Sequence, residues 1–386
     1  MTKSTASLGD VAEVNPRLTA VPDGPISFLG MADIREDGTT TSGVDRDFSE
    51  VRKGYTPFSD GDILLAKITP CFQNGKIAQA KLRNRQGMGS TEFHVIRGHQ
   101  QIVDQRYLLH FLRRKEVLLD GERRMTGSGG QRRVPVEFVK ALEVPLPPLP
   151  EQRRIAAILD HADALRAKRR ATVSALGDLG RSAFSAKALT ASPSRLGDAL
   201  TFVTSGGRGW AKYYVAEGGS PFIRSLDVQM NSISDADLAY VSAPMSAEAK
   251  RTQTEQGDVL LTITGSRIGR AATLPASMSG SHVSQHVAIL RPDTRRLLPE
   301  FLSAFLCSED WGQRQIRENQ YGQTKPGLNF EQIRDFTIPL PEIERQREFV
   351  ANSRTLMARR DTYLASSRAL DSLFVSLQSQ AFRGDL

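Results

Sequence analysis

Residues 144–155 read VPLPPLPEQRRI, and residues 338–349 read IPLPEIERQREF. The two stretches lie 194 residues apart, and each places a Pro-Leu-Pro run before a polar turn that contains Gln-Arg. Prolines end a β-like segment because they have no backbone N–H to donate, and the polar turn then begins a helix. A strand-to-helix junction that occurs twice predicts that the chain is a tandem duplication.

Further matches follow in the same order along both halves. Their offsets lie between 188 and 196 residues, and loop insertions account for such drift. The matched segments are 8–10 with 196–198, 61–65 with 257–261, and 107–112 with 301–306. We therefore expect a globular domain and then a long helix, twice over. The expected parts are a first domain at 1–148, a first helix at 149–190, a second domain at 191–341 and a second helix at 342–386.

The two domains are expected to have an α+β fold. Short apolar runs rich in β-branched residues predict strands at 62–68 and 93–96, and at the equivalent positions 258–263 and 287–290. Apolar residues with helical spacing predict helices over 104–119 and 299–318. Glycine and proline gather in the loops between these elements.

The two long helices carry a seam of apolar or small residues with alternating steps of three and four, which is typical of a coiled coil. Each is expected to run for roughly 30 residues, or about 45–50 Å. A duplicated chain favours a pseudo-two-fold arrangement in which the helices pair antiparallel and separate the two domains. Packing of each helix on its own domain, or on another protein, stays open. The seam residues are Ile155, Ile158, Ala162, Leu165, Leu176, Leu179 and Ala183, and Phe349, Leu356, Tyr363, Leu370, Phe374, Leu377 and Ala381.

The composition favours an anionic partner. The net charge is +8 and the isoelectric point is about 9.6. Such a basic surplus is typical of proteins that bind nucleic acid, although a merely basic soluble protein stays open. Two cysteines, Cys71 and Cys307, exclude a disulfide framework and a cysteine-rich zinc site. No segment has the ~18 apolar residues of a membrane span or the core of a signal peptide, so we expect a cytoplasmic protein without membrane association.

The sequence holds no recognisable catalytic motif. It lacks a phosphate-binding Gly-Lys-Ser/Thr loop, a GxGxxG turn, an HExxH pair and a GxSxG elbow. His282 and His286 have metal-ligand spacing, but they border a strand-like run, where a structural histidine is the commoner case. We therefore expect no catalytic residue, no metal site and no cofactor bound by this chain, although an enzyme with an unrecognised site, such as a nuclease, stays a third hypothesis.

Polar loops at equivalent positions of the two halves supply the candidate DNA contacts. Loops 126–133 and 319–326 precede the strand that leads into each long helix, and loops 67–76 and 264–270 follow the Gly-Asp strands. Glutamine can pair with adenine, and arginine or lysine with guanine or phosphate, while a solvated polar turn is the alternative. Residues 206–214 add cations beside aromatic residues, which are more readily explained as core or loop anchors.

The candidate DNA-binding residues fall in these loops and in the segments that return beside them. In the first half they are Lys67, Thr69, Gln73, Asn74, Lys76, Ser90, Thr91, Ser128, Gln131, Arg132 and Arg133. In the second half they are Arg208, Lys212, Tyr213, Ser266, Arg267, Arg270, Gln285, Gln323, Thr324 and Lys325.

With these motifs the chain resembles the specificity subunits of type I restriction-modification enzymes. The resemblance rests on the paired Pro-Leu-Pro helix starts, the Gly-Asp-Ile/Val-Leu-Leu strands, the Gly-Gln-rich loops and the helix endings that contain Ala183-Phe184 and Ala381-Phe382. It covers nearly the whole chain. The first helix ends without the Gly-Asp pair seen at 384–385, which leaves the end of that helix open.

The resemblance implies that each domain is a target recognition domain that reads one half of a split, asymmetric site on double-stranded DNA. It also implies that the helices dock two methyltransferase subunits, which carry S-adenosylmethionine and methylate adenine, and restriction subunits that use ATP and Mg²⁺ in a full complex. Candidate partner contacts are Gln152, Arg153, Leu165, Gln346, Arg347 and Leu356. Two readers about 45–50 Å apart would span about 13–15 base pairs. A coiled-coil scaffold that binds only protein is the alternative function.

Overall fold

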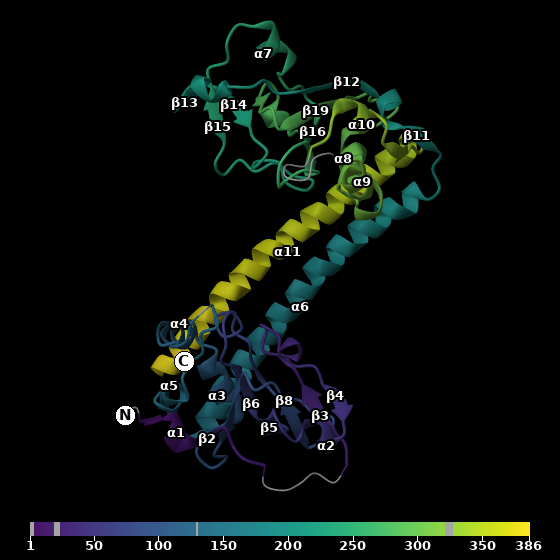
Figure 1. Cartoon of the computed structure of the whole chain (residues 1–386). Coiled ribbons are helices and arrows are strands. Elements are labelled where there is room, and N and C mark those ends of the chain that lie inside the picture. Colours follow the sequence, from purple (N-terminus) through teal and green to yellow (C-terminus); the bar gives the residue numbers. More distant parts are fainter. Residues whose placement is uncertain (1–3, 19–23, 129, 321–326) are drawn as a thin grey trace. The chain divides into compact units, whose positions relative to one another are not determined.

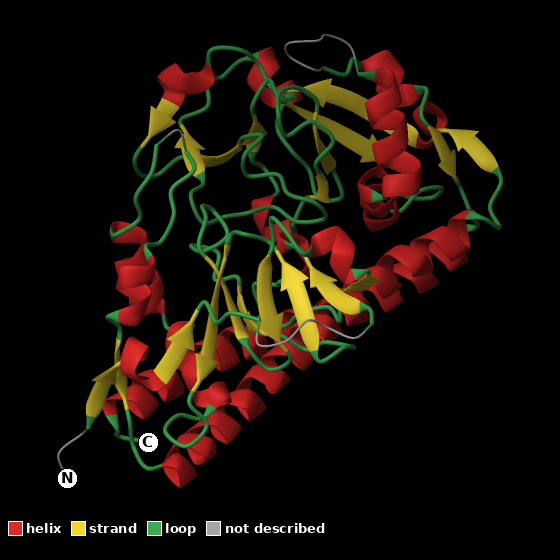
Figure 2. Cartoon of the chain, turned by 60° about the horizontal axis from the view of Figure 1, so that its bottom comes forward, coloured by secondary structure: helices red, strands yellow, loops and turns green. Residues whose placement is uncertain are grey.

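The structure is a computed structural model that describes all residues except 1–3, 19–23, 129 and 321–326. Internal contacts divide the chain into two units, which we describe separately (Figures 1 and 2). Unit 1 joins residues 1–171 to residues 364–386, and unit 2 holds residues 172–363. The two longest helices, α6 (Leu149–Ala188) and α11 (Ile343–Arg383), therefore each contribute one end to each unit. We call them the spacer helices.

Among its described residues, unit 1 forms two four-stranded sheets and a short ribbon. One sheet is antiparallel with the order β2-β9-β6-β7, and the other has the order β4-β3-β8-β5 with a parallel β3–β8 pair. Strand β1 pairs with β10 and so ties the start of the domain to the segment before α6. The strands are β1 Thr5–Ser7, β2 Ala12–Val14, β3 Ile26–Leu29, β4 Val44–Arg46, β5 Thr56–Ser59, β6 Ile63–Ala66, β7 Ile77–Gln79, β8 Gln86–Gly89, β9 Phe93–Gly98 and β10 Glu143–Pro145. The helices are α1 Leu8–Val11, η1 Met31–Asp33, α2 Phe48–Val51, α3 Gln105–Leu112, α4 Lys115–Arg123 and α5 Val136–Lys140.

Unit 2 repeats this plan. Its first sheet has the equivalent order β12-β19-β16-β17, and its ribbon pairs β11 with β20. Its second sheet, β13-β15-β14-β18, keeps one parallel pair, β14–β18. The strands are β11 Pro193–Arg195, β12 Leu200–Ser205, β13 Tyr214–Val215, β14 Ser220–Ile223, β15 Ala239–Val241, β16 Val259–Thr262, β17 Ala271–Thr273, β18 His282–Val283, β19 Val287–Pro292 and β20 Thr337–Pro339. The helices are η2 Leu196–Ala199, η3 Trp210–Tyr213, α7 Ala247–Arg251, η4 Ala276–Met278, α8 Pro299–Cys307, η5 Glu309–Gln313, α9 Arg314–Asn319 and α10 Phe330–Arg334.

The predicted α+β fold in tandem with long helices is confirmed, and so are the four predicted strands. The two shorter helices are each broken where a single helix was expected. Residues 104–119 form α3 and the start of α4, and residues 299–318 form α8, a π-helical turn and α9. The second sheets also differ in one edge strand. In unit 1 the edge strand β5 pairs with β8, whereas in unit 2 the edge strand β13 pairs with β15.

The Gly-Asp motif of each half closes a turn around a buried ion pair. Asp62 is 3% exposed and accepts two hydrogen bonds from Arg97 of β9, at 2.8 and 2.7 Å. Asp258 is fully buried and accepts the same two from Arg291 of β19, at 2.7 and 2.9 Å. The arginines are 34% and 24% exposed, so it is removal of the arginine that leaves a buried charge, at a cost of several kcal/mol. The pair therefore holds β6 to β9, and β16 to β19, in both units.

A buried glutamine anchors the start of each spacer helix. Gln152 accepts a hydrogen bond from the Asp104 amide (2.8 Å) and donates to the carbonyls of Ile102 (3.0 Å) and Pro147 (2.9 Å). Gln346 makes the same three contacts in unit 2, with Leu298, Arg296 and Pro341, at 2.8–2.9 Å. The two glutamines are 1% and 0% exposed. Each side chain thus joins its helix to the loop before α3 or α8 and to the proline run.

The end of each spacer helix packs on the other domain's helix. Phe382 of α11 contacts Tyr107 and Phe111 of α3 in unit 1, with ring centroids 5.0 and 5.6 Å apart. Phe184 of α6 contacts Phe301 of α8 in unit 2 at 5.3 Å. In unit 1 the two spacer helices run antiparallel, since Arg154 and Arg166 of α6 hydrogen-bond, in reverse order, Leu386 just beyond α11 and Asp371 of α11. In unit 2, Lys187 near the end of α6 pairs with Glu348 near the start of α11.

The spacer helices are longer and less tightly packed than expected. They have 40 and 41 residues where about 30 were predicted. In α6 the helix begins before the polar turn, at Leu149, because Pro150 lies in the first turn, where proline is tolerated. Their apolar seam is buried only near the ends. No residue in 163–183 or 351–373, all of them described, is buried, and Leu165 and Leu179 are 41% and 53% exposed. Among the described residues, no helix is both long and apolar enough to span a membrane.

The glutamine anchor predicts a measurable loss of stability. Gln152→Leu keeps the side-chain size but leaves buried backbone groups without partners, so unit 1 should be destabilised by about 2–4 kcal/mol. Hydrogen exchange of α3 and the start of α6 in the full chain would report the loss for that unit alone. The exposed neighbour supplies the control, since Arg153→Leu should change stability by less than about 0.5 kcal/mol. Equal protection in both variants would contradict the anchor.

Candidate nucleic-acid interface

In unit 1, the two predicted contact loops lie side by side. Loop 67–76 leaves β6, and its first amide, that of Lys67, donates to the Glu92 carbonyl (2.9 Å). The Lys67 carbonyl then accepts from the Val134 amide (2.8 Å), just after loop 126–133. Isolated bridges also join Ile68 to Arg133 and Thr126 to Arg133. The polar residues that the sequence placed in three segments therefore share one end of the sheet.

Thr69 clamps the glycine-rich loop. Its hydroxyl donates to the Gly130 carbonyl (2.7 Å) and accepts from the Arg132 amide (3.1 Å), and its amide donates to the Arg132 carbonyl (3.0 Å). Gly127 and Gly130 have φ of 124° and 78°, which favour glycine. A Cβ on Gly127 would lie 2.7 Å from the Gln131 carbonyl oxygen. The glycines are thus required for the loop to fold tightly against Thr69.

A second clamp joins Arg133 to Glu92. The guanidinium donates to both carboxylate oxygens at 2.8–2.9 Å. This hydrogen-bonded pairing lowers the pKa of Glu92 more than partial burial raises it. Arg133 was predicted to bind DNA; in the structure its guanidinium holds the loop, and the DNA contact stays a prediction.

The other candidates in unit 1 are of two kinds: residues whose side chains make contacts inside the unit, and residues that are exposed. Lys76 donates to the Met31 carbonyl (3.1 Å), Ser90 accepts from the Glu92 amide (3.1 Å), and Gln73 lies 3.5 Å from a Glu122 oxygen. Lys67 is half-buried beside Glu92. The exposed candidates, available to a ligand, are Asn74, Thr91, Ser128, Gln131 and Arg132.

Unit 2 brings the equivalent segments together with different residues. The Ile263 amide donates to the His286 carbonyl (2.9 Å), and the Leu328 amide donates to the Ile263 carbonyl (2.9 Å). The Thr264 hydroxyl contacts Nδ1 of His286, and Gln285 contacts Nε2 of the same ring (3.2 Å). His286 is therefore a hydrogen-bonded loop residue rather than half of a metal pair. Searched over the described parts of the chain, no cluster of His, Cys, Asp or Glu could hold a metal ion.

Two of the predicted cations in unit 2 hold a neighbouring loop. Arg267 donates to the Leu226 carbonyl (3.0 Å) and Arg270 to the Gln229 side chain (2.6 Å). Ser266 beside them is exposed. Gln323, Thr324 and Lys325 lie outside the described residues.

The glycine-rich segment 206–213 begins beside this loop cluster. A Cβ on Gly206 would lie 1.8 Å from the Val283 carbonyl oxygen, so only glycine fits there. Trp210 is 4% exposed and stacks on Phe222, as expected for a core anchor. Tyr213 is half-buried against Trp210 with the Lys212 ammonium 4.9 Å from its ring, and Arg208 and Lys212 are exposed.

The partner candidates divide in the same way. Gln152 and Gln346 are buried anchors, so we leave them out of any partner surface. Arg153 and Leu165 are exposed on α6, and Arg347 is exposed on α11 beside Glu344. Leu356 is half-buried and lines a groove in unit 2.

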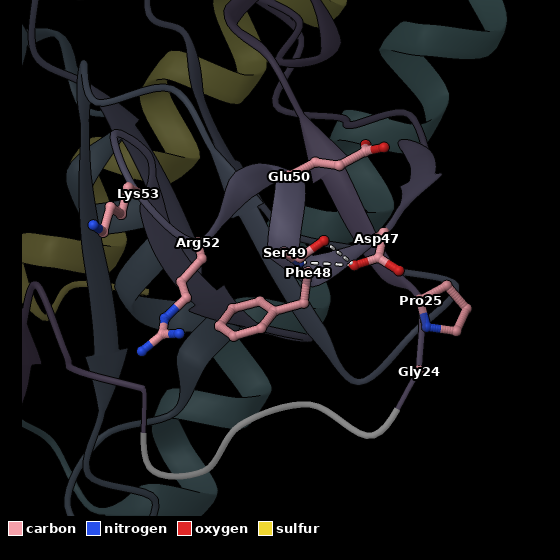
Figure 3. A pocket seen from close by; sticks show the side chains of 8 residues that line it. All are labelled: Gly24, Pro25, Asp47, Phe48, Ser49, Glu50, Arg52 and Lys53. Atoms are coloured by element: carbon pink, nitrogen blue, oxygen red, sulfur yellow. Dashed lines mark hydrogen bonds between the residues drawn. The ribbon is translucent and has the colours of Figure 1, made fainter.

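A separate hollow of about 820 Å³ opens at helix α2 in unit 1 (Figure 3). Its lining pairs the cations Arg52 and Lys53 with the acids Asp47 and Glu50. Asp47 caps the helix by accepting from the Ser49 amide (2.8 Å). The balanced charges favour no single class of ligand.

The contact loops of both units thus sit on a common frame of sheet and spacer helix. The family described as type I restriction modification DNA specificity domain matches residues 2–175 and again residues 194–352. The chain belongs to this family. The predicted resemblance is confirmed, with one family domain in each half. A role in DNA sequence specificity follows from the membership.

Curated relatives share part of their length with this family member. The specificity subunits of the type I restriction enzymes EcoAI and EcoEI of Escherichia coli are 43% and 42% identical to it over 153 residues. Each match covers 39% of this chain and 26% of the relative. The chain therefore spans about a quarter of the length of the curated relatives that it matches.

Solved structures share the fold along the whole chain. A chain from a study of complex assembly and conformational transition of the type I R-M system has a TM-score of 0.59 at 19% identity, covering 99% of this chain and 98% of that one. The S subunit of the type I restriction-modification system of M. genitalium has a TM-score of 0.57 at 14% identity, covering 98% and 96%. At these identities the likeness concerns the fold alone.

Several residues that shape the interface were not among the candidates. Glu92 clamps Arg133, and His286 orients the loop of Thr264. The ion pairs of Asp62 and Asp258 support the strands beneath, and their duplication in the sequence was a usable signal. No comparable signal marked Glu92, because its partner lies 41 residues away.

The Glu92–Arg133 clamp predicts a pH-dependent loop. The pKa of Glu92 is lowered in the folded chain, so its contribution is fully present above its ordinary value of 4.5 and is lost as the pH falls through the folded pKa. Hydrogen exchange of residues 126–133, corrected for intrinsic rates, should therefore accelerate below about pH 4.5. Glu92→Gln should exchange faster at pH 7 already and lose this pH step. Glu137→Gln, an exposed carboxylate nearby, should behave as wild type; a step retained in Glu92→Gln would contradict the clamp.

Proposed function

We propose that this chain is a non-catalytic specificity subunit in which each domain reads one half of a split, asymmetric DNA site. The observation that carries the proposal is a duplicated frame with unlike loops. Both units keep the Asp–Arg pair under the sheet and the glutamine anchor of the spacer helix. In the loops that follow the two Gly-Asp strands, unit 1 presents Asn74, whereas unit 2 presents Ser266 and Arg267. Unlike side chains on equivalent frames favour unlike half-sites.

Phosphate attraction is expected to supply much of the affinity. The chain has a net charge of +8, and exposed cations lie in or beside the contact loops of both units. DNA binding should therefore weaken steeply as salt rises, since bound cations release counterions from the duplex.

The spacer helices set the gap between the half-sites. At 1.5 Å per residue, 40 residues extend about 60 Å, which corresponds to at most about 18 base pairs. The 30-residue helices expected from the sequence gave about 13–15 base pairs, so the longer helices raise the upper limit.

We further propose that the spacer helices dock two methyltransferase subunits, which bring S-adenosylmethionine and methylate adenine. Restriction subunits with ATP and Mg²⁺ would join a full complex. The support is the unburied middle of both helices, with Leu165 and Leu179 exposed on α6 and Met357 and Leu373 exposed on α11. A partner that covers them removes apolar surface from water. Arg153 and Arg347 stand exposed near the helix starts.

Replacement of one domain tests the reading directly. The full chain is mixed with a cognate methyltransferase subunit, and methylated DNA is sequenced. Replacing residues 1–145 with the same region of a relative should change one half of the methylated site and leave the other half and the gap unchanged. Methylation indifferent to the replacement would overturn the proposal. Absence of salt-dependent DNA binding with the partner present would favour a protein-only scaffold.

The exposed loop of unit 1 predicts a local loss of specificity. Arg132→Ala should weaken binding to the cognate site by about 1–3 kcal/mol if it reads a base, and should relax the preference at one half-site. Competition binding at fixed salt would measure both effects. Arg83→Ala removes the same charge between β7 and β8, away from the strand ends that lead to Lys76 and Ser90, and should lose little. An equal loss of binding for both variants would show that Arg132 does not read a base.

A further inference from the structure

Unit 2 contains a groove of about 470 Å³ between the two spacer helices and α8. Its apolar lining comes from Leu176 and Phe184 of α6 and from Leu356 and Met357 of α11. Cys307 adds a neutral surface, because burial raises the pKa of its thiol to about 11. We call this the unit 2 groove.

The duplication supplies an internal comparison, because unit 1 fills the equivalent place with its own side chains. Phe374, Gln378, His110 and Leu159 occupy it, and all four are at most 8% exposed. Gln378 donates to the His110 carbonyl (3.0 Å), and the His110 ring lies 6.3 Å from that of Phe374. Unit 1 therefore shows how this junction looks when it is complete.

Smaller residues stand at the same positions in unit 2. The offset between the two halves is 194 residues at the helix starts and 198 residues at the Ala-Phe endings. Phe374 and Gln378 of unit 1 therefore correspond to Leu176 and Gly180 of unit 2. His110 and Leu159 correspond to Ala304 and Ser353. All four line the groove. Protein interiors are packed densely, and a cavity at a helix junction is destabilising. The groove thus offers the space of the side chains that unit 1 has and unit 2 lacks.

The charge pattern differs in the same way. Arg166 in unit 1 lies 4.2 Å from the Phe374 ring centroid and donates to Asp163 (2.6 Å) and Asp371 (2.7 Å). Its counterpart Arg360 lines the unit 2 groove, but Met357 and Val173 stand where the two aspartates would be.

Another arginine of the groove, Arg354, is already paired with Glu300. Among the residues that the structure describes, no carboxylate pairs with Arg360. An arginine beside apolar surface without its acid is a site for an incoming carboxylate.

We propose that the unit 2 groove receives a large apolar side chain of a protein partner, together with a neighbouring carboxylate that pairs with Arg360. The inference rests on the proposed docking of partners along the spacer helices. The partner segment carries an aromatic or large aliphatic residue within one helical turn of an aspartate or glutamate. Because unit 1 is filled, the two ends of the spacer hold their partners unequally, and one copy binds more tightly than the other.

Charge reversal tests the proposal. The probe is a cognate methyltransferase subunit, titrated into the full-length chain by calorimetry. Wild type should show two classes of site that differ in affinity. Arg360→Glu should weaken the tighter class at least tenfold, whereas Arg359→Glu, the exposed neighbour outside the groove, should stay within about twofold. Equal effects of the two variants, or none, would overturn the proposal.

Filling the groove separates binding from folding. The double variant Gly180→Gln with Ala304→His carries the residues of unit 1. Its melting temperature should not fall, since glutamine favours a helix more than glycine does, yet its tighter site should weaken at least tenfold. Unchanged binding by this stable variant would count against the groove. If the double variant melts at a lower temperature than wild type, Gly180→Gln alone is tested in its place. The expected and the contradicting results are the same for this single variant.

A photocrosslinker at Met357, which is 43% exposed, identifies the occupant. The captured partner peptide should contain the apolar–acidic pair, and a peptide without a carboxylate would contradict the proposal. The two proposals fail differently. If wild type binds no methyltransferase subunit, the docking function fails and takes this inference with it. If wild type binds and both groove variants bind equally well, only this inference fails.

Discussion

A buried glutamine at the start of each spacer helix is the interaction on which the rest of the structure depends. Gln152 and Gln346 each join three segments: the proline run, the loop before α3 or α8, and the spacer helix itself. The amide is used for one acceptor and two donor contacts inside the protein, so any other arrangement leaves buried polar groups without partners. The direction of the helix is thereby tied to the domain. The contact loops extend from the sheet of the same domain, so their position is tied to the direction of the helix as well.

Much of this frame could be predicted from the sequence, and the reasons are local. The Pro-Leu-Pro runs and the Gly-Asp turns depend on neighbouring residues, so their repetition revealed the duplication. The loops were predicted as well, and the structure brings two of them together in unit 1, while their contact with DNA stays a prediction. The hydrogen bonds within them could not be predicted, because Thr69 and Arg133 bind residues about 40 to 60 positions away. The roles of Gln152 and Gln346 were misassigned for the same reason, since a polar residue at a helix start looks exposed until the loop that covers it is known.

The duplication divides into features that are kept and features that have diverged. The ion pairs of Asp62 and Asp258, the glutamine anchors and the terminal phenylalanines are kept, because each fills a buried position in its unit. The contact loops diverge, in agreement with two different half-sites. The junction of the spacer helices diverges too, since Phe374 and His110 close it in unit 1 while Leu176 and Ala304 leave it open in unit 2. The difference between the two sets of contact loops and the difference between the two partner surfaces would then have one origin, which is sequence divergence between two copies of a single unit.

The central claim is that one chain reads two unlike half-sites with an unread gap between them. Genome-wide mapping of methylated adenines in cells that express only this chain and its methyltransferase subunit tests it most directly. The account predicts a single bipartite motif with two different short half-sites and a gap of fixed length, no longer than the ~60 Å spacer helix allows. A continuous motif, two identical half-sites in palindromic order, or a gap of variable length would contradict it.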